Sequence, residues 1–289
     1  MTAPSDAPLD ADLLAIDVGS SCIKLGWFRA AGACGDAPAS GLPIAASPLP
    51  TPEEMIRVEH RQRDADAWGA ELDGWLDATP ASPDAWCLVG SVHPGIGGAV
   101  LARLAARRWS RCAQVAAAQL PIEVRTATPQ RVGIDRLLGA LAVNRLRAAG
   151  RPAISIDMGT ATTVDLIAAD GGFLGGAILA GAWLSLAALH AGTASLPGMD
   201  ESAIVRPATA VGVTTEQALL AGAYWGALGG VNEMVRRVAD EAGAPPELYL
   251  TGGAAPAFAD DIELVGRPAR HVPHLVLAGL RLAAAEWPS

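Results

Sequence analysis

Positive charge is scarce in this sequence, and its scarcity excludes one broad class of function. The 289 residues contain 21 Lys and Arg against 30 Asp and Glu, so the formal net charge is −9. A nucleic-acid-binding surface needs clustered Lys and Arg to neutralise phosphates. The densest basic stretch holds four arginines between residues 103 and 111, and we interpret it as a solvated helix face rather than a phosphate-contacting patch. The sequence predicts no nucleic-acid partner.

Cysteine pairs and metal-ligand spacings are also missing. Four cysteines form no C-x-x-C pair, and five histidines show no metal-ligand spacing. Unpaired thiols suit a reducing compartment. Residues 1–12 hold three Asp and no Lys or Arg, so they lack the positive segment that opens a signal peptide. We therefore expect a cytoplasmic protein whose residues 1–12 form a disordered tail.

Two further absences concern membranes and nucleotides. The longest nearly uncharged stretch, residues 171–199, contains seven glycines and has no Lys or Arg at either end. A membrane span is less interrupted and is oriented by flanking basic residues, so we predict a buried, tightly turning segment and no membrane partner. No G-x-x-x-x-G-K-[ST] pattern occurs, which excludes a P-loop. We interpret the glycines at 95–98 as the turn that opens a helix.

What is present is the composition and periodicity of an α/β protein. Apolar residues make up 51% of the chain and charged residues 18%, and the length allows one large domain or two ordinary ones. Apolar runs predict a hairpin over 13–28, and strands at 85–89, 122–124, 153–157, 162–168 and 248–250. Helical spacing predicts helices over 66–76, 98–109, 134–149, 183–191, 214–242 and 275–285. Five prolines between 36 and 52 restrict any strand there to a sheet edge.

An internal repeat is the most informative feature. The predicted strand that ends at Asp17 runs into a turn that reads I-D-V-G-S-S, and the later strand that ends at Asp157 runs into I-D-M-G-T-A-T-T. Each copy is a strand, a turn and a returning strand. A repeated unit of this kind indicates duplicated half-molecules.

The repeated turn has the chemistry of a phosphate clamp. Its glycine lets backbone N–H groups approach phosphate oxygens, and its hydroxyls add donors. The carboxylate can hold a cation or its water shell beside the phosphates, and Lys24 can neutralise charge that develops on a transferred group. A single D-x-G-S turn is more often an ordinary hairpin. Two copies at matching strand ends favour a pair of hairpins that grip a triphosphate from two halves of the molecule. Asp165, on the second returning strand, either joins its clamp or faces solvent.

The ordered set of motifs resembles type III pantothenate kinase. It comprises D-V-G-S-S-C-I-K at 17–24, G-I-D-R at 133–136, D-M-G-T-A-T-T-V-D at 157–165, G-G-A-I-L-A-G at 175–181 and T-G-G-A at 251–254. The resemblance implies duplicated actin/ribonuclease H-like α/β domains of the acetate and sugar kinase, heat-shock protein and actin (ASKHA) superfamily, with a cleft between them. We expect an N-terminal domain over 13–132 and a C-terminal domain over 133–289.

The same resemblance implies an activity and its cofactors. Members phosphorylate pantothenate with ATP in the first step of coenzyme A synthesis, act as homodimers and require a monovalent cation, potassium or ammonium. Magnesium is expected on the ATP oxygens and water rather than in a protein cage. By resemblance, ATP is bound by Asp17, Val18, Gly19, Ser20, Ser21, Cys22, Ile23, Lys24 and Thr160.

The remaining site residues come from the later motifs. The resemblance assigns Asp157 to the monovalent cation, and Gly133, Ile134, Asp135, Arg136 and Thr215 to the substrate, with Thr215 reaching the substrate of the neighbouring subunit. Asp135 matches the general base, because a carboxylate in hydrogen-bond reach can take a hydroxyl proton. Arg136 suits the carboxylate of pantothenate. Without the D-x-G motifs, Asp135 would be interpreted as an acid that favours a helix N-terminus.

Two departures and two alternatives accompany this interpretation. Ser20 and Ser21 stand where the family has Asn-Thr, which predicts weaker nucleotide binding, and Thr126 replaces a family tyrosine in the pantothenate pocket wall.

One alternative to a pantothenate kinase is an accessory protein that keeps the scaffold without activity. Another small-molecule kinase of the superfamily is the second, because a fold does not determine the acceptor.

Overall fold

The chain folds into two compact units that are interleaved in sequence. The computed structural model describes residues 11–30, 49–79, 85–107, 109 and 111–286. Its contacts group residues up to 122, 127–146 and from 274 onward as unit 1, and 123–126 and 147–273 as unit 2. This division differs from the predicted boundary after residue 132, because two later helices pack with unit 1. The predicted tail lies outside the described residues as far as residue 10, and so does most of the proline-rich stretch.

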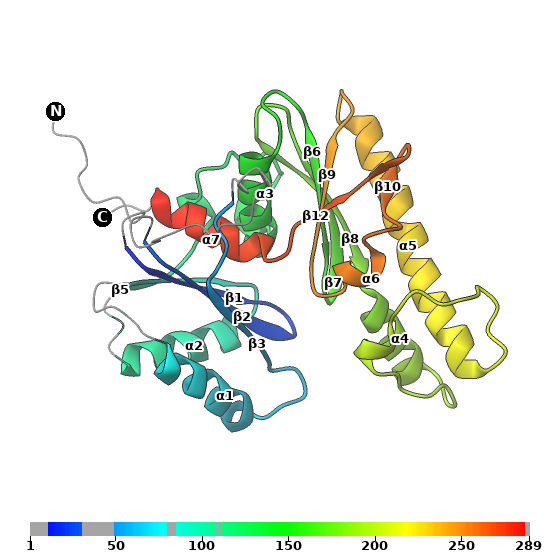
Figure 1. The fold of residues 1–289 in the computed structure, drawn as a ribbon, viewed down its shortest axis with the longest axis horizontal. Helices are drawn as coiled ribbons and strands as arrows, with labels where there is room; N and C mark the ends of the chain where they lie inside the picture. Colours follow the sequence, from blue (N-terminus) through cyan, green and yellow to red (C-terminus); the bar gives the residue numbers. More distant parts are fainter. Residues whose placement is uncertain (1–10, 31–48, 80–84, 108, 110, 287–289) are drawn as a thin grey trace, which may run out of the picture. The chain divides into compact units, whose positions relative to one another are not determined.

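Unit 1 is a five-stranded sheet with helices on both faces (Figure 1). The strand order is β3 (Glu54–Glu59), β2 (Cys22–Phe28), β1 (Leu13–Val18), β4 (Trp86–Ser91) and β5 (Arg111–Gln114). Helices α1 (Ala65–Ala78) and α2 (Pro94–Ala106) cover one face, and α3 (Ile134–Leu146) and α7 (Leu275–Ala285) cover the other. Every residue of β1 is buried, as a central strand covered on both faces requires.

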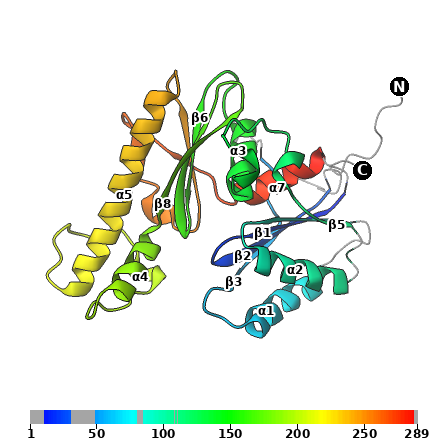
Figure 2. The same cartoon turned by 180° about the vertical axis from the view of Figure 1, so that it is seen from behind.

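Unit 2 is built on a second five-stranded sheet, seen from behind in Figure 2. Its strand order is β8 (Phe173–Ala180), β7 (Ala161–Ile167), β6 (Ala153–Met158), β9 (Glu247–Thr251) and β12 (Arg270–His271). The long helix α5 (Thr215–Glu241) packs on this sheet, and α4 (Ala182–Gly192) packs on α5. The short helix α6 (Ala255–Phe258) follows β9, and β10 (Glu263–Leu264) and β11 (Arg267–Pro268) form a small hairpin.

The two sheets repeat one topology. In unit 1, β1 pairs antiparallel with β2 and parallel with β4, β2 pairs antiparallel with β3, and β4 pairs parallel with β5. In unit 2, β6, β7, β8, β9 and β12 show the same order and the same directions. The duplication that the two D-x-G motifs predicted is therefore confirmed, and each unit has the actin/ribonuclease H-like fold.

Helix α3 is fixed in unit 1 by unusually close packing against α7. Gly279 of α7 is buried, and a Cβ at this position would lie 2.2 Å from the backbone oxygen of Leu138 in α3. On the other side of α3, a Cβ on Gly90 of β4 would lie 2.9 Å from the Leu138 side chain. Glycine at both positions lets α3 sit in contact with helix and sheet. The close contact with α7 explains why α3 belongs to unit 1.

We expect Gly279→Ala to destabilise the fold and to displace α3. The added methyl meets backbone rather than a flexible side chain, so we expect overpacking to lower the free energy of unfolding by roughly 1–3 kcal/mol. The shift of the urea midpoint measures this loss. The matched control is Gly222→Ala in α5, where nothing lies within 4 Å of the added Cβ. That change is expected to leave stability unchanged or to raise it by up to about 1 kcal/mol, because alanine is the better helix former. Equal midpoints for the two variants would contradict this packing argument.

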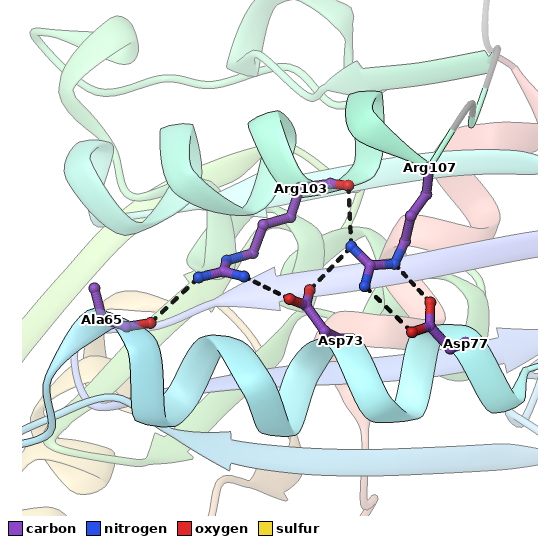
Figure 3. Close-up of polar contacts among 5 residues, drawn as sticks. All are labelled: Ala65, Asp73, Asp77, Arg103 and Arg107. Carbon is purple, nitrogen blue, oxygen red and sulfur yellow. Dashed lines mark hydrogen bonds and ion pairs between the residues drawn. The ribbon is translucent and has the colours of Figure 1, made fainter.

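The arginine-rich stretch turns out to be paired rather than solvated. Arg103 Nη1 lies 2.6 Å from Asp73 Oδ2, and Arg107 bridges Asp73 and Asp77 at 3.0 and 2.9 Å (Figure 3). These contacts join α2 to α1, and both arginine side chains are about a quarter exposed. The prediction of an open solvated face is therefore wrong for these two arginines. The helix predicted over 98–109 is observed at Pro94–Ala106. Arg111, the last arginine of the stretch, lies in β5 rather than in this helix.

Two other elements differ from prediction. Strand β8 occupies much of the stretch predicted to turn tightly, and its alternate residues are exposed, with Ile178 63% accessible. A glycine is required within it, because a Cβ on Gly176 would lie 2.1 Å from the Val164 oxygen. The predicted strand at 122–124 is only an isolated bridge between Val124 and Phe173. Among the described residues, the helices lack the combination of length and apolar character needed to cross a bilayer.

Candidate functional site

The first D-x-G motif forms a tight turn between β1 and β2. The Gly19 N–H donates to the Cys22 carbonyl at 3.0 Å, so Ser20 and Ser21 form the tip of the hairpin. Ser20 is exposed and Ser21 is buried. Among the residues that the resemblance assigned to ATP, Val18 and Ile23 lie in the apolar core of unit 1. Their side chains anchor the turn, and its polar tip is left to meet a ligand.

Asp17 and Lys24 face each other across this hairpin. They are register partners in β1 and β2, and directly paired side chains lie on the same face of a sheet. Lys24 Nζ is 3.8 Å from Asp17 Oδ2, and the lysine side chain is 26% exposed. An ammonium group is therefore held beside the turn by a buried carboxylate and still reaches solvent.

Lys24 is also the only lysine in the sequence, since every other residue among the 21 Lys and Arg is an arginine. Lysine carries a compact point charge, whereas arginine carries a planar fork with a different hydrogen-bond geometry. We therefore expect lysine and arginine not to be interchangeable at position 24.

Asp135 lies in the first turn of α3 and is half-buried beside the end of β4. Its Oδ1 accepts the backbone N–H of Arg136 at 2.8 Å. Burial raises the pKa of Asp135 above its ordinary value, while the N–H and the charge of Arg136 lower it, as does the charge of Lys24. Burial is the largest of these effects. The result is a carboxylate of increased basicity, which suits a proton acceptor.

Unit 1 brings the end of β1 and the G-I-D-R motif together, although they lie far apart in the sequence. The Val92 N–H donates to the Val18 carbonyl at 3.0 Å, and a Cβ on Gly133 would lie 3.7 Å from the Val92 side chain. Gly133 makes the turn into α3, and its carbonyl accepts the N–H groups of Arg136 and Leu137. Ile134 is buried, whereas Asp135 and Arg136 are both partly exposed, so both charged side chains of this motif can reach a soluble ligand.

The second D-x-G motif forms a shorter turn in unit 2. The Gly159 N–H donates to the Ala161 carbonyl at 3.1 Å, which leaves Thr160 alone at the tip. Asp157 has Thr163 and Thr251 as its register partners in β7 and β9. The three side chains share one sheet face. They form an oxygen-rich set of a carboxylate and two hydroxyls, a donor set that suits a hard cation.

The T-G-G turn after β9 packs tightly on this second motif. Gly252 has a positive φ of 105°, and a Cβ there would lie 2.4 Å from the Met158 oxygen. The Ala254 N–H donates to that same oxygen at 2.9 Å. Glycine is thus needed at 252 for both conformation and space. The third candidate in unit 2, Thr215, is exposed at the start of α5, and Thr214 caps that helix by accepting the Gln217 N–H.

Three findings bear on residues whose roles the sequence left open. Asp165 is 1% exposed in β7, so the interpretation that it faces solvent is wrong. Thr126, which replaces a family tyrosine, has a buried hydroxyl oxygen with no hydrogen-bond partner among the described residues. The part of the chain that the structure describes contains no group of three His, Cys, Asp or Glu side chains placed to bind a metal ion.

Comparison with known proteins identifies the family. A family model for type III pantothenate kinase matches residues 13–237. A type III pantothenate kinase of Acidiphilium cryptum is 35% identical over 242 residues, which cover 79% of this chain and 84% of that protein. The chain belongs to the type III pantothenate kinase family. The residues matched by the family model, 13–237, include both D-x-G motifs, the G-I-D-R motif and the exposed start of α5.

Other relatives in the family align over a shorter range. The type III pantothenate kinase of Gluconobacter oxydans is 42% identical over 163 residues, 56% of this chain and 57% of that protein. That of Parafrankia is 39% identical over 154 residues, 53% of this chain and 58% of that protein. The chain thus spans just over half the length of these two relatives.

A solved structure supports the fold alone. The ethanolamine utilization protein EutJ from Carboxydothermus hydrogenoformans matches 96% of this chain and 90% of its own, with a TM-score of 0.53 at 14% identity. The agreement concerns the arrangement of strands and helices and carries no information about substrates.

Proposed function

We propose that this protein transfers the γ-phosphoryl group of ATP to the hydroxyl group of pantothenate and so forms 4′-phosphopantothenate, the first step of coenzyme A synthesis. One observation carries the proposal within the family: the G-I-D-R motif, with the half-buried Asp135, lies close to the strand end from which the Asp17–Lys24 hairpin turns, because Val92 donates its N–H to Val18 and a Cβ on Gly133 would lie 3.7 Å from the Val92 side chain. A cation for the phosphoryl group and an acceptor for the hydroxyl proton are the two parts that phosphoryl transfer requires.

The proposed chemistry assigns each group one task. The turn of residues 17–24 holds phosphate oxygens through its backbone N–H groups and serine hydroxyls, and the resemblance adds Thr160 as a further donor. The pantothenate oxygen attacks the γ-phosphorus, the bond to the leaving ADP oxygen breaks, and the hydroxyl proton passes to the Asp135 carboxylate. Lys24 neutralises the charge that develops on the transferred group. Arg136 pairs with the carboxylate of pantothenate.

Cations complete the proposed site. Asp157, together with Thr163 and Thr251, offers the oxygen donors for potassium or ammonium. When bound, this cation would supply positive charge to balance the nucleotide phosphates. The register partner of Asp17 is Lys24 rather than a threonine. The two aspartates would therefore bind different cations: Asp17 the ammonium group of Lys24, and Asp157 an inorganic ion. Magnesium arrives on the ATP oxygens.

An ADP-release assay tests the function. We expect ADP release only with pantothenate present, and only with potassium or ammonium rather than sodium in the buffer. Asp157→Asn is expected to raise the potassium concentration needed for half-maximal rate about tenfold, because it removes one charge from the donor set. Its control is Asp240→Asn, an exposed residue of the same unit that pairs with Arg236 on the surface of α5.

The assay also separates the alternatives. ADP binding without any phosphorylated pantothenate by mass spectrometry would contradict the proposal and favour an accessory protein. Turnover with a different alcohol and none with pantothenate would favour another kinase of the superfamily. A potassium response that Asp157→Asn leaves unchanged would remove the cation assignment alone.

A homodimer is the assembly we propose. Its support is a pair of exposed apolar side chains, Val211 and Val213, which are 77% and 84% exposed and lie in the segment that resembles the family's intersubunit contact. Exposed apolar groups of this size are typical of interaction surfaces. Thr215 follows directly, at the start of α5. Light scattering of the purified protein measures its mass and distinguishes dimer from monomer.

Cys22, Cys87 and Cys112 are free thiols, which supports a cytoplasmic location.

A further inference from the structure

The first phosphate-binding turn is held by two residues that no motif includes. His60 and Arg61 follow the end of β3, well beyond the turn in the sequence. The backbone N–H groups of His60 and Arg61 both donate to the Ser21 carbonyl, at 3.0 and 3.1 Å. His60 Nε2 is 3.0 Å from the Gly19 carbonyl oxygen, and Arg61 Nη1 donates to Ser21 Oγ at 3.0 Å. Four hydrogen bonds from one dipeptide thus converge on two residues of the turn.

The duplicated unit shows which of these bonds belong to the fold. Strand β8 occupies the place in unit 2 that β3 occupies in unit 1. The residue after β8 is Gly181, and its N–H donates to the Thr160 carbonyl at 3.1 Å. A backbone bond from the end of the third strand to the tip of the turn is therefore common to both units. The side-chain bonds of His60 and Arg61 have no equivalent there, because Gly181 has no side chain and Ala182 has only a methyl group.

Space explains the difference between the units. A Cβ on Gly181 would lie 2.4 Å from the Gly159 oxygen and 2.5 Å from the Thr160 oxygen, so the second turn lies directly against this backbone. The first turn has a two-residue tip instead of one. A longer tip has more conformational freedom to lose on binding a ligand. In unit 1, where the turn is longer, the His60 and Arg61 side chains add two hydrogen bonds to the backbone contact that both units share.

The protonation and polarity of these groups suit that restraint. His60 is 7% exposed, and burial is the main cause that lowers its pKa, which favours a neutral ring. A carbonyl oxygen only accepts, so the proton of the neutral ring must lie on Nε2. The imidazole of His93 packs edge-on against His60 with ring centroids 5.6 Å apart, which limits the ring's freedom. Ser21 Oγ accepts from the cationic Arg61 guanidinium, and a hydrogen bond with one charged partner is stronger than a neutral one.

We propose that His60 and Arg61 are positioning residues for nucleotide binding, which they support by holding the Gly19–Ser21 turn in its phosphate-binding conformation. The inference rests on the proposed function, since it assigns the turn to ATP. The restraint on the turn thus comes from residues outside the D-x-G motif.

Steady-state kinetics with varied ATP tests this. We expect Arg61→Ala and His60→Leu each to raise the KM for ATP, and the Kd for ADP measured by calorimetry, about tenfold, as loss of a charge-assisted or buried hydrogen bond predicts. The KM for pantothenate should stay within about twofold. Arg61→Lys and His60→Gln, which each keep an N–H donor, should recover part of the affinity.

The matched control is Arg63→Ala. Arg63 is in the same segment and carries the same charge, but it bonds to Glu71 and to the Glu59 and Ala67 carbonyls instead of to the turn. An equal rise in KM for Arg63→Ala would overturn the proposal, because a general charge effect would then suffice. Unchanged KM for ATP in folded Arg61→Ala would also overturn it. If His60→Leu fails to fold, Arg61→Ala and Arg61→Lys decide.

A failure of this inference can be told apart from a failure of the proposed function. Lys24→Met removes a residue of the turn's own hairpin without touching His60 or Arg61. If Lys24→Met loses activity while Arg61→Ala keeps the wild-type KM for ATP, the turn binds nucleotide and needs no restraint. If Lys24→Met is fully active, the assignment of the turn itself is wrong.

Discussion

Asp135→Asn should reduce kcat about a thousandfold while the protein stays folded, the size expected when a general base is removed. Asparagine has almost the same volume as aspartate and can still accept the Arg136 N–H through its amide oxygen. It cannot take the hydroxyl proton of pantothenate. The KM values for ATP and pantothenate should change little, because the lost interaction belongs to the chemical step.

The control for this variant is another aspartate at a helix start. Asp66 lies in the first turn of α1, as Asp135 lies in the first turn of α3, but it is exposed. Asp66→Asn repeats the chemical change and the effect on a helix terminus and should leave kcat unchanged. Wild-type turnover by Asp135→Asn would remove the catalytic assignment and restore the interpretation of Asp135 as an ordinary helix-terminal acid.

The raised pKa of Asp135 adds a pH dependence with a defined sign. The base must be ionised, so kcat should fall as the pH drops through a value above the ordinary aspartate pKa. The contribution of Asp135 to folding stability has the opposite pH dependence from its contribution to kcat. A carboxyl group whose pKa is higher in the folded than in the unfolded protein stabilises the fold below its unfolded pKa and loses that contribution as the pH rises through the folded value. At neutral pH, Asp135→Asn should therefore unfold at an equal or higher urea concentration than the wild type.

Lys24→Met should reduce kcat about a hundredfold or more, because a preorganised cation near the transferred group strongly stabilises the transition state. Methionine keeps much of the length and packing of the side chain and removes the charge. The Asp17 carboxylate, only 9% exposed, then loses its ion pair with Lys24, so some loss of stability should accompany the loss of rate.

Lys24→Arg should fail nearly as badly, and this result would separate charge from shape. The guanidinium keeps the positive charge but cannot occupy the compact position 3.8 Å from Asp17 Oδ2 with the same geometry. Since the rest of the chain carries arginine and no lysine, an active Lys24→Arg variant would show that the single lysine has no special role. Wild-type kcat in Lys24→Met would exclude Lys24 from the reaction altogether.

The single lysine also permits a chemical test. An amine-selective acylating reagent can modify only Lys24 and the N-terminal amine in this chain. ATP should slow modification of Lys24 and leave modification of the N-terminus unchanged, as peptide mass spectrometry would detect. The N-terminal amine serves as an internal control for the reagent. Equal modification of both amines with and without ATP would contradict the placement of Lys24 at the phosphates.

Local sequence patterns predicted much of the fold, and the site residues they indicate remain predictions. The hairpin of β1 and β2 was predicted because an apolar run, a Gly-Ser-Ser turn and a second apolar run form a local unit. The closing helix α7 was predicted with its observed bounds, since its apolar residues recur with helical spacing. The repeat of D-x-G in the two halves of the chain predicted the duplication that the two sheet orders confirm.

Features that depend on distant pairing were missed or misjudged. Strand β8 was interpreted as part of a turning segment, because its glycines weaken any strand signal, whereas Gly176 is required by close approach to β7. The arginines of α2 gave no indication of the α1 carboxylates that pair with them.

The sequence by itself determined the local chemistry of this protein: two turns rich in donors, a lone lysine and an acid at the start of a helix, each encoded within a few consecutive residues. The tertiary structure decided which of them meet. It packed α3 against α7 through the Gly279 contact, and it brought His60 and Arg61 onto Ser21 from the end of β3. The physical reason is that hydrogen bonds and packing between distant segments depend on sheet register and helix approach, which no short pattern of residues encodes.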